Sequence, residues 1–254
     1  MANWSDPRTS AAAYAPGAAR ADYDAGLRSY MLSVYNYMLS GVLLTGIVAL
    51  AFGKIESLQR LLFVVQETSR GFSIGPSLLG WLVMLSPLAI VFAMSFGQQR
   101  MSEGTLKALF FAYAGLLGAS LSTIFITYTD ASIAQVFFGT AAGFAGLSLY
   151  GYTTKKDLSG LGTFLIMGLI GLIVASIVNI FIGSSTMNLV ISVIGVLIFA
   201  GLTAYDTQKI KSIYAHVAGT DMMGKVVIMG ALNLYLDFIN MFLFLLRLFG
   251  SSRN

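Results

Sequence analysis

The sequence predicts an all-α membrane protein with seven transmembrane helices. Of its 254 residues, 57% are hydrophobic and only 10% are charged, whereas about 25% of the residues of a soluble protein are charged. The mean hydropathy is +0.80. Apolar segments also recur along the chain, each long enough to cross about 30 Å of hydrocarbon. So few charges could not cover the core of a soluble domain of this length, so we expect the lipid bilayer to surround the protein.

The expected elements follow in order along the chain. Residues 1–25 are polar, contain proline and have no apolar run, so they are expected to form a flexible cytoplasmic tail and not a signal peptide. Residues 26–250 are expected to form one seven-helix transmembrane domain. The predicted spans lie near 33–53, 77–97, 106–126, 131–152, 161–182, 187–211 and 226–249. After the first span, the apolar positions between Ile55 and Val65 share one helical face, which predicts a short helix on the membrane surface.

The basic residues predict the orientation of the spans. Ten of the 15 Lys and Arg residues fall in the tail or near the loops that follow spans two, four and six, and five fall on the other side. The positive-inside rule then places the N-terminus in the cytoplasm and the C-terminus outside. The net charge of +4 is therefore expected to set orientation, and we expect no nucleic-acid partner.

Composition also limits the chemistry and the packing. The chain has no cysteine and one histidine, which excludes disulfides, thiolate metal sites, cysteine nucleophiles and histidine-rich metal sites. Many of the 27 glycines lie inside the spans. The sequence GTAAG at 139–143 has small residues four apart, a pattern that lets transmembrane helices approach closely.

Two aspartates within the last two spans are the candidate functional residues. Acids inside spans are costly and face a bundle interior or water. Asp237 lies about 16 Å into the seventh predicted span, and Asp206 lies near the end of the sixth. Each belongs to a polar helical stripe. The seventh span carries Gly230, Asn233, Asp237, Asn240 and Arg247, and the sixth carries Ser192, Gly195, Thr203 and Asp206.

Two facing stripes would bring the two carboxyl groups together. In a low dielectric both cannot ionise cheaply, so the pair is expected to share a proton, and when both are ionised to attract a hard divalent cation. Alternatively, Asp206 ends its helix and is neutralised by Lys209 or Lys211. Arg100 ends span two on the same side of the membrane, either as the nearest cation to the pair or as an ordinary membrane anchor.

The sequences FAGLTAYDTQKIKSIY and ALNLYLDFINMFLFLLRLFG resemble the closing signature of the Bax inhibitor-1 family, and the seven-span layout agrees over about residues 26–250. The resemblance implies a central seventh helix surrounded by the other six, and a pH-sensitive calcium leak. It implies that Asp206 and Asp237 form a hydrogen-bonded pair near the cytoplasmic mouth, and that Arg100, by its place after span two, is a latch. The short tail and compact loops are similar to those of a bacterial member, which implies the inner membrane.

Three functions follow from these features. The first is a cation leak channel, not an enzyme, which is gated by the proton-sharing pair Asp206 and Asp237 and conducts Ca²⁺ without a permanently bound cofactor. The second is a non-transporting regulator that binds a membrane partner such as a protease. The third is an intramembrane aspartyl protease, although the surroundings of Asp237, YLDFIN, lack the glycines expected for one.

Overall fold

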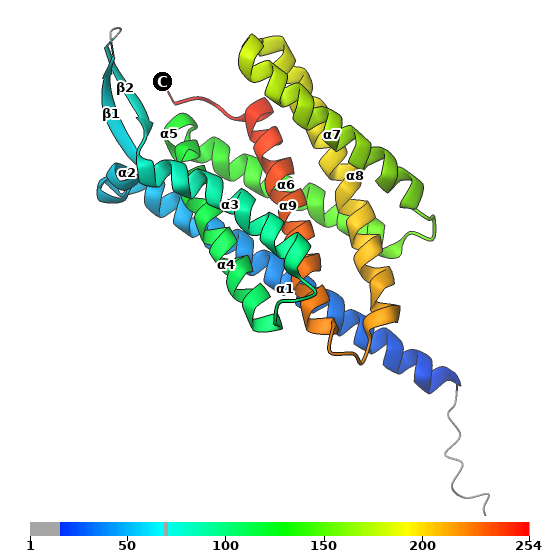
Figure 1. The fold of residues 1–254 in the computed structure, drawn as a ribbon. Coiled ribbons are helices and arrows are strands. Elements are labelled where there is room, and N and C mark those ends of the chain that lie inside the picture. Colours follow the sequence, from blue (N-terminus) through cyan, green and yellow to red (C-terminus); the bar gives the residue numbers. More distant parts are fainter. Residues whose placement is uncertain (1–15, 69–70, 254) are drawn as a thin grey trace, which may run out of the picture.

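The computed structural model describes residues 16–68 and 71–253, which form long helices and one two-stranded hairpin (Figure 1). The elements are α1 (Pro16–Lys54), α2 (Glu56–Leu62), β1 (Phe63–Thr68), β2 (Gly71–Pro76), α3 (Leu78–Gly97), α4 (Glu103–Ser120), η2 (Leu121–Thr123), α5 (Ile124–Thr127), α6 (Asp130–Thr153), α7 (Ser159–Ile182), α8 (Ser185–Val217) and α9 (Met223–Phe249). The described part contains seven helices long and apolar enough to cross a membrane, with α4, η2 and α5 counted as one. This confirms the predicted all-α membrane fold.

Most of these spans begin where the sequence supplies a cap. Ser77, Ser102, Thr129 and Ser184 each accept a hydrogen bond from the backbone N–H three residues later. Such caps satisfy N–H groups that the first turn of a helix leaves free. Gly183 ends α7 with a φ of 68°, a conformation that glycine adopts without strain. The turn between α7 and α8 is therefore only two residues long.

The first helix begins earlier than the sequence patterns predicted. Residues 16–25, assigned to a flexible tail, form the start of α1, and residues 1–15 lie outside the described part of the chain. The segment opens with Pro16, which suits the first position of a helix. It is also rich in alanine, the strongest helix former. Helix propensity accounts for this early start, because the segment has no apolar run.

The surface segment after α1 is only partly helical. The helix α2 ends at Leu62, and β1 and β2 then form an antiparallel hairpin in which Phe63 lies opposite Pro76 and Thr68 opposite Gly71. The prediction of a helix that continues to Val65 is wrong. Two consecutive β-branched residues, Val64 and Val65, favour a strand at this point.

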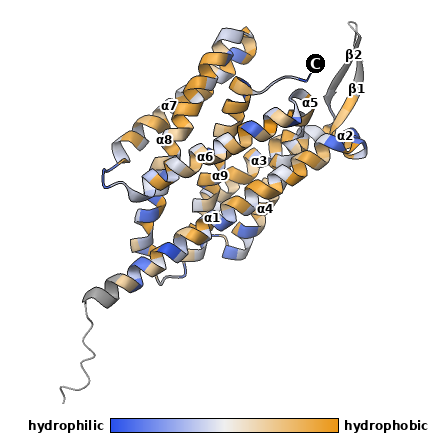
Figure 2. Ribbon diagram, turned by 180° about the vertical axis from the view of Figure 1, so that it is seen from behind, coloured by the Kyte–Doolittle hydropathy of each residue, from blue (hydrophilic) through white to orange (hydrophobic). Residues whose placement is uncertain are grey.

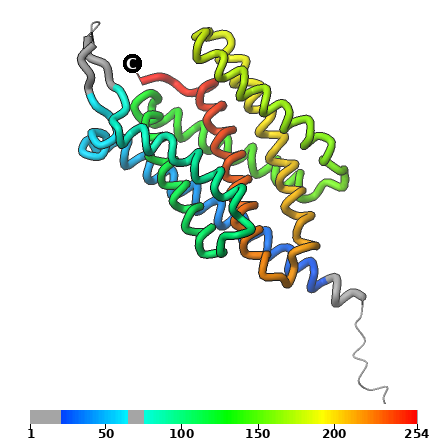
Figure 3. The backbone as a smooth tube through the Cα atoms, in the orientation of Figure 1, coloured from blue at the N-terminus to red at the C-terminus, as the bar shows by residue number. Residues whose placement is uncertain are grey.

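The helix α9 is the most enclosed span. In its most apolar window 67% of the residues are buried, against 17–44% in the other six spans. It packs against α1, α4, α6 and α8, whereas α3 packs mainly on α4 and α7 on α8 (Figure 3). A ring of all six other spans around α9 is therefore not confirmed. Instead α9 lies between two groups, α1 with α3 and α4, and α6 with α7 and α8.

The outer surface of the bundle is apolar. Figure 2 shows orange hydrophobic residues along the spans and blue hydrophilic residues gathered mainly near their ends. On α7 the side chains of Ile180 and Phe181 are 78% and 85% exposed. Large apolar side chains that are exposed in this way are more stable in the hydrocarbon of a bilayer than in water. Their distribution therefore agrees with a multi-pass membrane protein.

The glycines that permit close packing are not those of the GTAAG sequence. A Cβ atom on Gly139 or Gly143 would meet nothing within 4 Å, so the predicted close approach at 139–143 is wrong. At Gly151 a Cβ would meet the carbonyl oxygen of Ala204, and at Gly118 it would lie 2.6 Å from that of Thr45. The packed face of α6 thus passes through Gly151, where α6 crosses α8.

A small ionic cluster ties together one end of the bundle. Asp130 accepts hydrogen bonds from Lys54 Nζ at 2.6 Å and from Arg253 Nη2 at 3.1 Å. The backbone N–H of Arg253 donates to Thr127 O at 2.8 Å, and that of Thr129 donates to Ser251 O at 3.0 Å. The segment after α9 is therefore fixed to the start of α6 and to the end of α1.

Candidate functional site

The two candidate acids lie on α8 and α9, which pack against each other as antiparallel neighbours. Both helices extend into the segment 212–225 that was expected to be a loop, and only residues 218–222 connect them. At Gly230 of α9 a Cβ atom would lie 3.3 Å from Ile210 of α8. This glycine lets the two helices run close together just beyond the candidate site.

The carboxyl groups lie at comparable depths in the two helices. Asp206 is about 16 Å before the end of α8 at Val217. Asp237 is about 21 Å after the start of α9 at Met223 and about 18 Å before its end at Phe249. The expected distance of about 16 Å into the last span was too short, because α9 begins before the apolar run. Asp237 therefore lies near the middle of its helix.

Both aspartates line one cavity of about 550 Å³ between α7, α8 and α9. Helix α7 contributes Ile166, Leu169, Leu172, Ile173, Ser176, Ile177 and Ile180; α8 contributes Phe199, Leu202, Tyr205, Asp206 and Lys209; α9 contributes Asn233, Leu236, Asp237, Asn240 and Phe244. The α7 wall is almost entirely apolar, and the polar groups come from α8 and α9. The cavity thus places the two carboxyl groups on a polar wall, with Lys209, Asn233 and Asn240, opposite an apolar wall.

The two carboxyl groups differ in burial. Asp237 is 4% exposed, and its Oδ2 atom is buried with no hydrogen-bond partner in the described part of the chain. Asp206 is half-buried. No hydrogen bond joins the two carboxyl groups among the residues described, so the direct bond implied by the family resemblance stays a prediction. Their common cavity is the geometric relation that the structure provides.

The predicted polar stripe of α9 corresponds to the cavity wall. Asn233, Asp237 and Asn240 all line the cavity, and Asn240 Nδ2 donates to Leu236 O at 2.8 Å. Arg247 is exposed, and its guanidinium carbon lies 5.4 Å from the ring centroid of Phe244. It therefore suits an anchor at the far end of the helix.

The predicted polar stripe of α8 lines the cavity only in part. The hydroxyl groups of Ser192 and Thr203 donate to carbonyl oxygens one turn earlier in their own helix. Neither residue lines the cavity, whereas Asp206 does. These hydroxyl groups form hydrogen bonds within their own helix, as serine and threonine inside helices commonly do.

Lysine residues near Asp206 take different positions. Lys209 lines the cavity, with its Nζ atom 5.9 Å from the ring centroid of Tyr205. Lys211 instead donates from Nζ to Tyr152 O at 2.7 Å. No ion pair within 4.0 Å joins either lysine to Asp206 in the part of the chain that the structure describes. Simple neutralisation of Asp206 by a paired lysine is therefore not seen.

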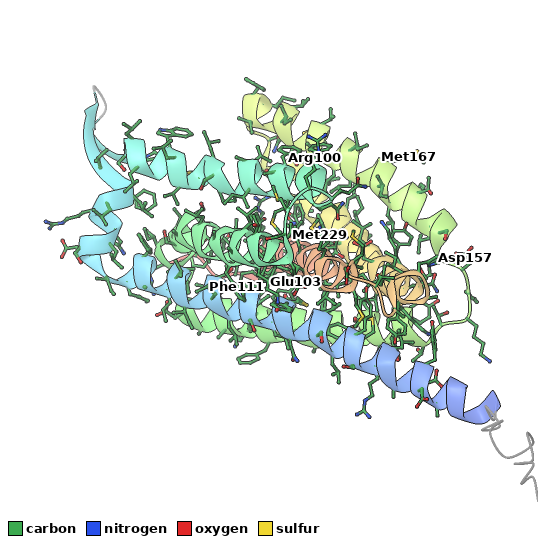
Figure 4. All side chains as sticks on the ribbon, turned by 60° about the horizontal axis from the view of Figure 1, so that its bottom comes forward. Arg100, Glu103, Phe111, Asp157, Met167 and Met229 are labelled. Atoms are coloured by element: carbon green, nitrogen blue, oxygen red, sulfur yellow. The ribbon has the colours of Figure 1, made fainter. Side chains whose placement is uncertain are left out.

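The structure does not bring Arg100 to the two aspartates. Figure 4 labels Arg100 at the turn between α3 and α4, apart from Asp157 in the loop between α6 and α7. Its side chain is exposed and lines none of the cavity around Asp237. Among the described residues no ion pair connects it to either acid. Its role as a latch stays a prediction.

One residue that the sequence patterns missed holds a loop beside the site. Gln208 Nε2 donates to Lys156 O at 2.8 Å, and Gln208 Oε1 accepts from the backbone N–H of Leu158 at 2.8 Å. The amide thus clamps the loop between α6 and α7 onto α8, two residues from Asp206. A polar uncharged residue in a basic helix end carries no sign of such a distant partner, so spacing alone could not reveal it.

Asp157 lies in the clamped loop and outside the spans. Its pKa is held below the usual range by hydrogen bonds that Ser159 donates, first from its hydroxyl and then from its backbone N–H. A carboxyl group with a lowered pKa in the folded protein stabilises the fold above its unfolded pKa, about 3.9. That contribution is lost as the pH falls through the folded pKa.

We therefore predict that Asp157→Ala makes the start of α7 exchange its amide hydrogens severalfold faster at neutral pH. The wild type should approach the variant only in strong acid, after Asp157 is protonated. Hydrogen exchange of the amides at 159–162, with intrinsic rates removed, measures this. Asp221→Ala is the matched control, because this exposed acid lies in another loop. Equal protection of wild type and Asp157→Ala at neutral pH would contradict the prediction.

The cavity offers few ligands for a resident metal ion. The described residues contain no cluster of three or more His, Cys, Asp or Glu side chains. Asp206 and Asp237 are two hard oxygen ligands, and the amide oxygens of Asn233 and Asn240 are the other candidates on the same wall. Calcium prefers six to eight oxygen ligands. Asp206, Asp237, Asn233 and Asn240 are thus candidate oxygen ligands for a cation.

The fold and the cavity define a class of multi-pass membrane protein with seven helical spans and an acidic cavity beside its most buried helix. Comparison with known proteins specifies it further. Residues 27–254 match the family model described as inhibitor of apoptosis-promoting Bax1. The chain therefore belongs to the Bax inhibitor-1 family.

Several bacterial proteins resemble the chain over nearly its whole length. The inner membrane protein YbhL of Escherichia coli is 46% identical over 90% of this chain and 94% of its own length. A protein of Rickettsia prowazekii is 47% identical over 91% of this chain and 93% of its own length. A membrane protein of Streptococcus pyogenes is 38% identical over 90% of this chain and 95% of its own length.

Proposed function

We propose that the protein is a pH-sensitive cation leak channel of the bacterial inner membrane that conducts calcium and is gated by Asp206 and Asp237. One observation carries this proposal: both carboxyl groups line the same cavity within the membrane-spanning helices, and the buried Oδ2 atom of Asp237 has no partner in the described structure. Unpaired intramembrane acids are expensive to keep and are typical of ion and proton pathways.

The proposed gate is a change in the charge of the carboxyl pair. Two ionised carboxylates in one cavity between membrane-spanning helices repel each other and attract a divalent cation. When they share a proton, the repulsion and the attraction for the cation both decrease. The same groups therefore sense protons and contact the passing ion, and no permanently bound cofactor is required. Arg100 is the proposed latch in a state other than the one described here.

Location and orientation follow from the same arguments. The name of the Escherichia coli relative places that protein in the inner membrane. Each of the seven candidate spans of the present chain has at least 20 residues, which is long enough to cross the hydrocarbon of a bilayer. The excess of Lys and Arg on one side supports a cytoplasmic N-terminus and an external C-terminus. The loop with Lys155 and Lys156 would then face the cytoplasm.

Calcium flux in proteoliposomes tests the proposed function. Wild type should conduct calcium at a rate that changes with pH. The double variant Asp206→Asn, Asp237→Asn fixes the pair in a neutral form, so its flux at every pH should equal that of the wild type at the lowest pH. Asp221→Asn, which neutralises an exposed acid outside the cavity, should behave as the wild type does.

Two outcomes would overturn the proposal that the protein is a channel gated by Asp206 and Asp237. If the wild type conducts no calcium above protein-free liposomes, the protein is not a leak channel, and co-purification with a membrane partner becomes the test of a regulator. If the double variant keeps the full pH response, the two aspartates are not the gate. Cleavage of a membrane substrate that Asp237→Ala abolishes would instead establish a protease.

A further inference from the structure

A second hollow lies on the opposite side of α9, between α1 and α6. Both helices pack against α9, but their backbones hardly approach each other. The space between them holds two neighbouring cavities of about 560 Å³ and 300 Å³. Phe238 of α9 lines both cavities. Together they form a groove along the side of the bundle, which we call the α1–α6 groove.

The larger cavity of the groove has the character of a lipid-chain site. It is lined by Arg28, Met31, Leu32, Tyr35, Met38 and Leu39 of α1, by Ala141, Phe144, Ala145, Ser148, Leu149 and Tyr152 of α6, and by Phe238 of α9. The distance from Arg28 to Leu39 along α1 is about 16 Å. This matches half of the hydrocarbon thickness of about 30 Å, which is the depth that the chains of one leaflet occupy.

The charged end of the groove lies at the depth of lipid head groups. The distance along α1 from Arg28 to Lys54 is about 39 Å, close to the 40–45 Å thickness, roughly, of a bilayer with its polar layers. Lys54 lies in the ionic cluster with Asp130 and Arg253 at the other end of the bundle. If that cluster lies at one polar layer, Arg28 lies at the opposite one.

The groove end is also basic. Arg28 is exposed, and within the described chain no carboxylate lies within 4.0 Å of its guanidinium group. Asp24, one helical turn earlier, is exposed as well and forms no ion pair with it. Lys211 of α8 adds a second cation, with Nζ at 4.8 Å from the ring centroid of Tyr152. Basic pockets between spans on one membrane side recognise anionic lipid head groups.

We propose that the α1–α6 groove binds one anionic phospholipid, with an acyl chain between α1 and α6 and its phosphate at Arg28. The apolar walls match the chain, the length of the cavity matches one leaflet, and the charge of Arg28 matches the phosphate. Tyr35 of α1 and Tyr152 of α6 line the cavity from its two walls.

The acyl chain would lie beside a series of hydrogen-bonded hydroxyl groups that leads from α1 through α6 to α8. Tyr35 Oη and Ser148 Oγ are 2.5 Å apart, and Ser148 Oγ and Thr207 Oγ1 are 2.9 Å apart. These bonds connect α1, α6 and α8, and Thr207 follows Asp206 directly. The wall of the groove at Tyr35 and Ser148 is therefore hydrogen-bonded to α8.

Native mass spectrometry of the full chain, released from micelles after titration with phosphatidylglycerol or phosphatidylcholine, tests the head-group contact. Wild type should retain phosphatidylglycerol about fivefold better than phosphatidylcholine, and Arg28→Gln should remove most of this preference. Lys225→Gln removes a cation that lies outside the groove, so this variant should keep the preference for phosphatidylglycerol. An unchanged preference in Arg28→Gln, or an equal loss in Lys225→Gln, would overturn the assignment of the phosphate to Arg28.

A second pair of variants tests the acyl-chain contact. Ala145→Trp fills the groove and should abolish retention of both lipids, whereas Ala142→Trp, on the same helix but outside the cavities, should not. Circular dichroism and thermal unfolding show whether each variant is folded. Full retention of lipid by folded Ala145→Trp would overturn the site. Displacement of phosphatidylglycerol by millimolar inorganic phosphate would do so as well, because it would identify a free anion as the ligand.

Discussion

Asp237→Leu is expected to stabilise the protein and to abolish the proposed pH-dependent calcium flux. The carboxyl group is 4% exposed, and its Oδ2 atom has no partner in the described structure. A buried polar group without a partner costs about 1–3 kcal/mol. The cavity of about 550 Å³ leaves room for the larger leucine side chain. The unfolding free energy in detergent should therefore rise by an amount in that range, while the flux no longer responds to pH.

Asn240→Leu is the matched control for this result. Asn240 lines the same cavity on the same helix, but its amide donates to Leu236 O at 2.8 Å. Its replacement removes a satisfied group and should produce no comparable gain in stability. If Asp237→Leu destabilises the protein instead, the carboxyl group has a stabilising partner that the geometry does not contain. A gain in stability with an unchanged pH response would separate Asp237 from gating.

Gly151→Ala is expected to destabilise the protein by about 1–3 kcal/mol, the usual cost of overpacking a close contact. The added Cβ atom would meet the carbonyl oxygen of Ala204, a backbone atom that cannot rotate away. Helices α6 and α8 would have to move apart at Ala204, which lies two residues before Asp206. The proposed calcium flux should change as well, because the position of α8 in the cavity wall depends on this crossing.

Gly143→Ala on the same helix should have the opposite effect. A Cβ atom there meets nothing within 4 Å, so alanine should stabilise the helix by about 0.5–1 kcal/mol through its higher propensity. Thermal unfolding of the two variants in the same detergent gives the comparison. Similar stabilities of Gly151→Ala and Gly143→Ala would show that the crossing of α6 and α8 adjusts without cost.

The spans and the polar wall of α9 could be predicted from the sequence because both depend on local periodicity. Hydropathy locates each span, and the spacing of Asn233, Asp237 and Asn240 places them on one face of a helix. The depth of Asp237 in its helix was predicted less accurately, because a helix continues beyond its apolar run for as long as propensity and caps allow. The same effect moved the start of α1 to Pro16.

Contacts between distant segments could not be predicted. The clamp of Gln208 on the loop between α6 and α7, the ionic cluster around Asp130 and the groove beside Arg28 all depend on how helices are placed relative to one another. The glycines show the difficulty most clearly. The GTAAG sequence has the spacing of a packing motif but faces outward, whereas Gly151 packs closely without any such spacing.

The position of α9 between two groups of helices has a consequence for biogenesis. The first group, α1 with α3 and α4, and the second, α6 with α7 and α8, are joined mainly through α9, which follows the other six spans in the chain. During synthesis the inner faces of both groups therefore stay uncovered in the bilayer until α9 is inserted. Its insertion joins them, and the bonds of Ser251 and Arg253 to the start of α6 then fasten the completed assembly.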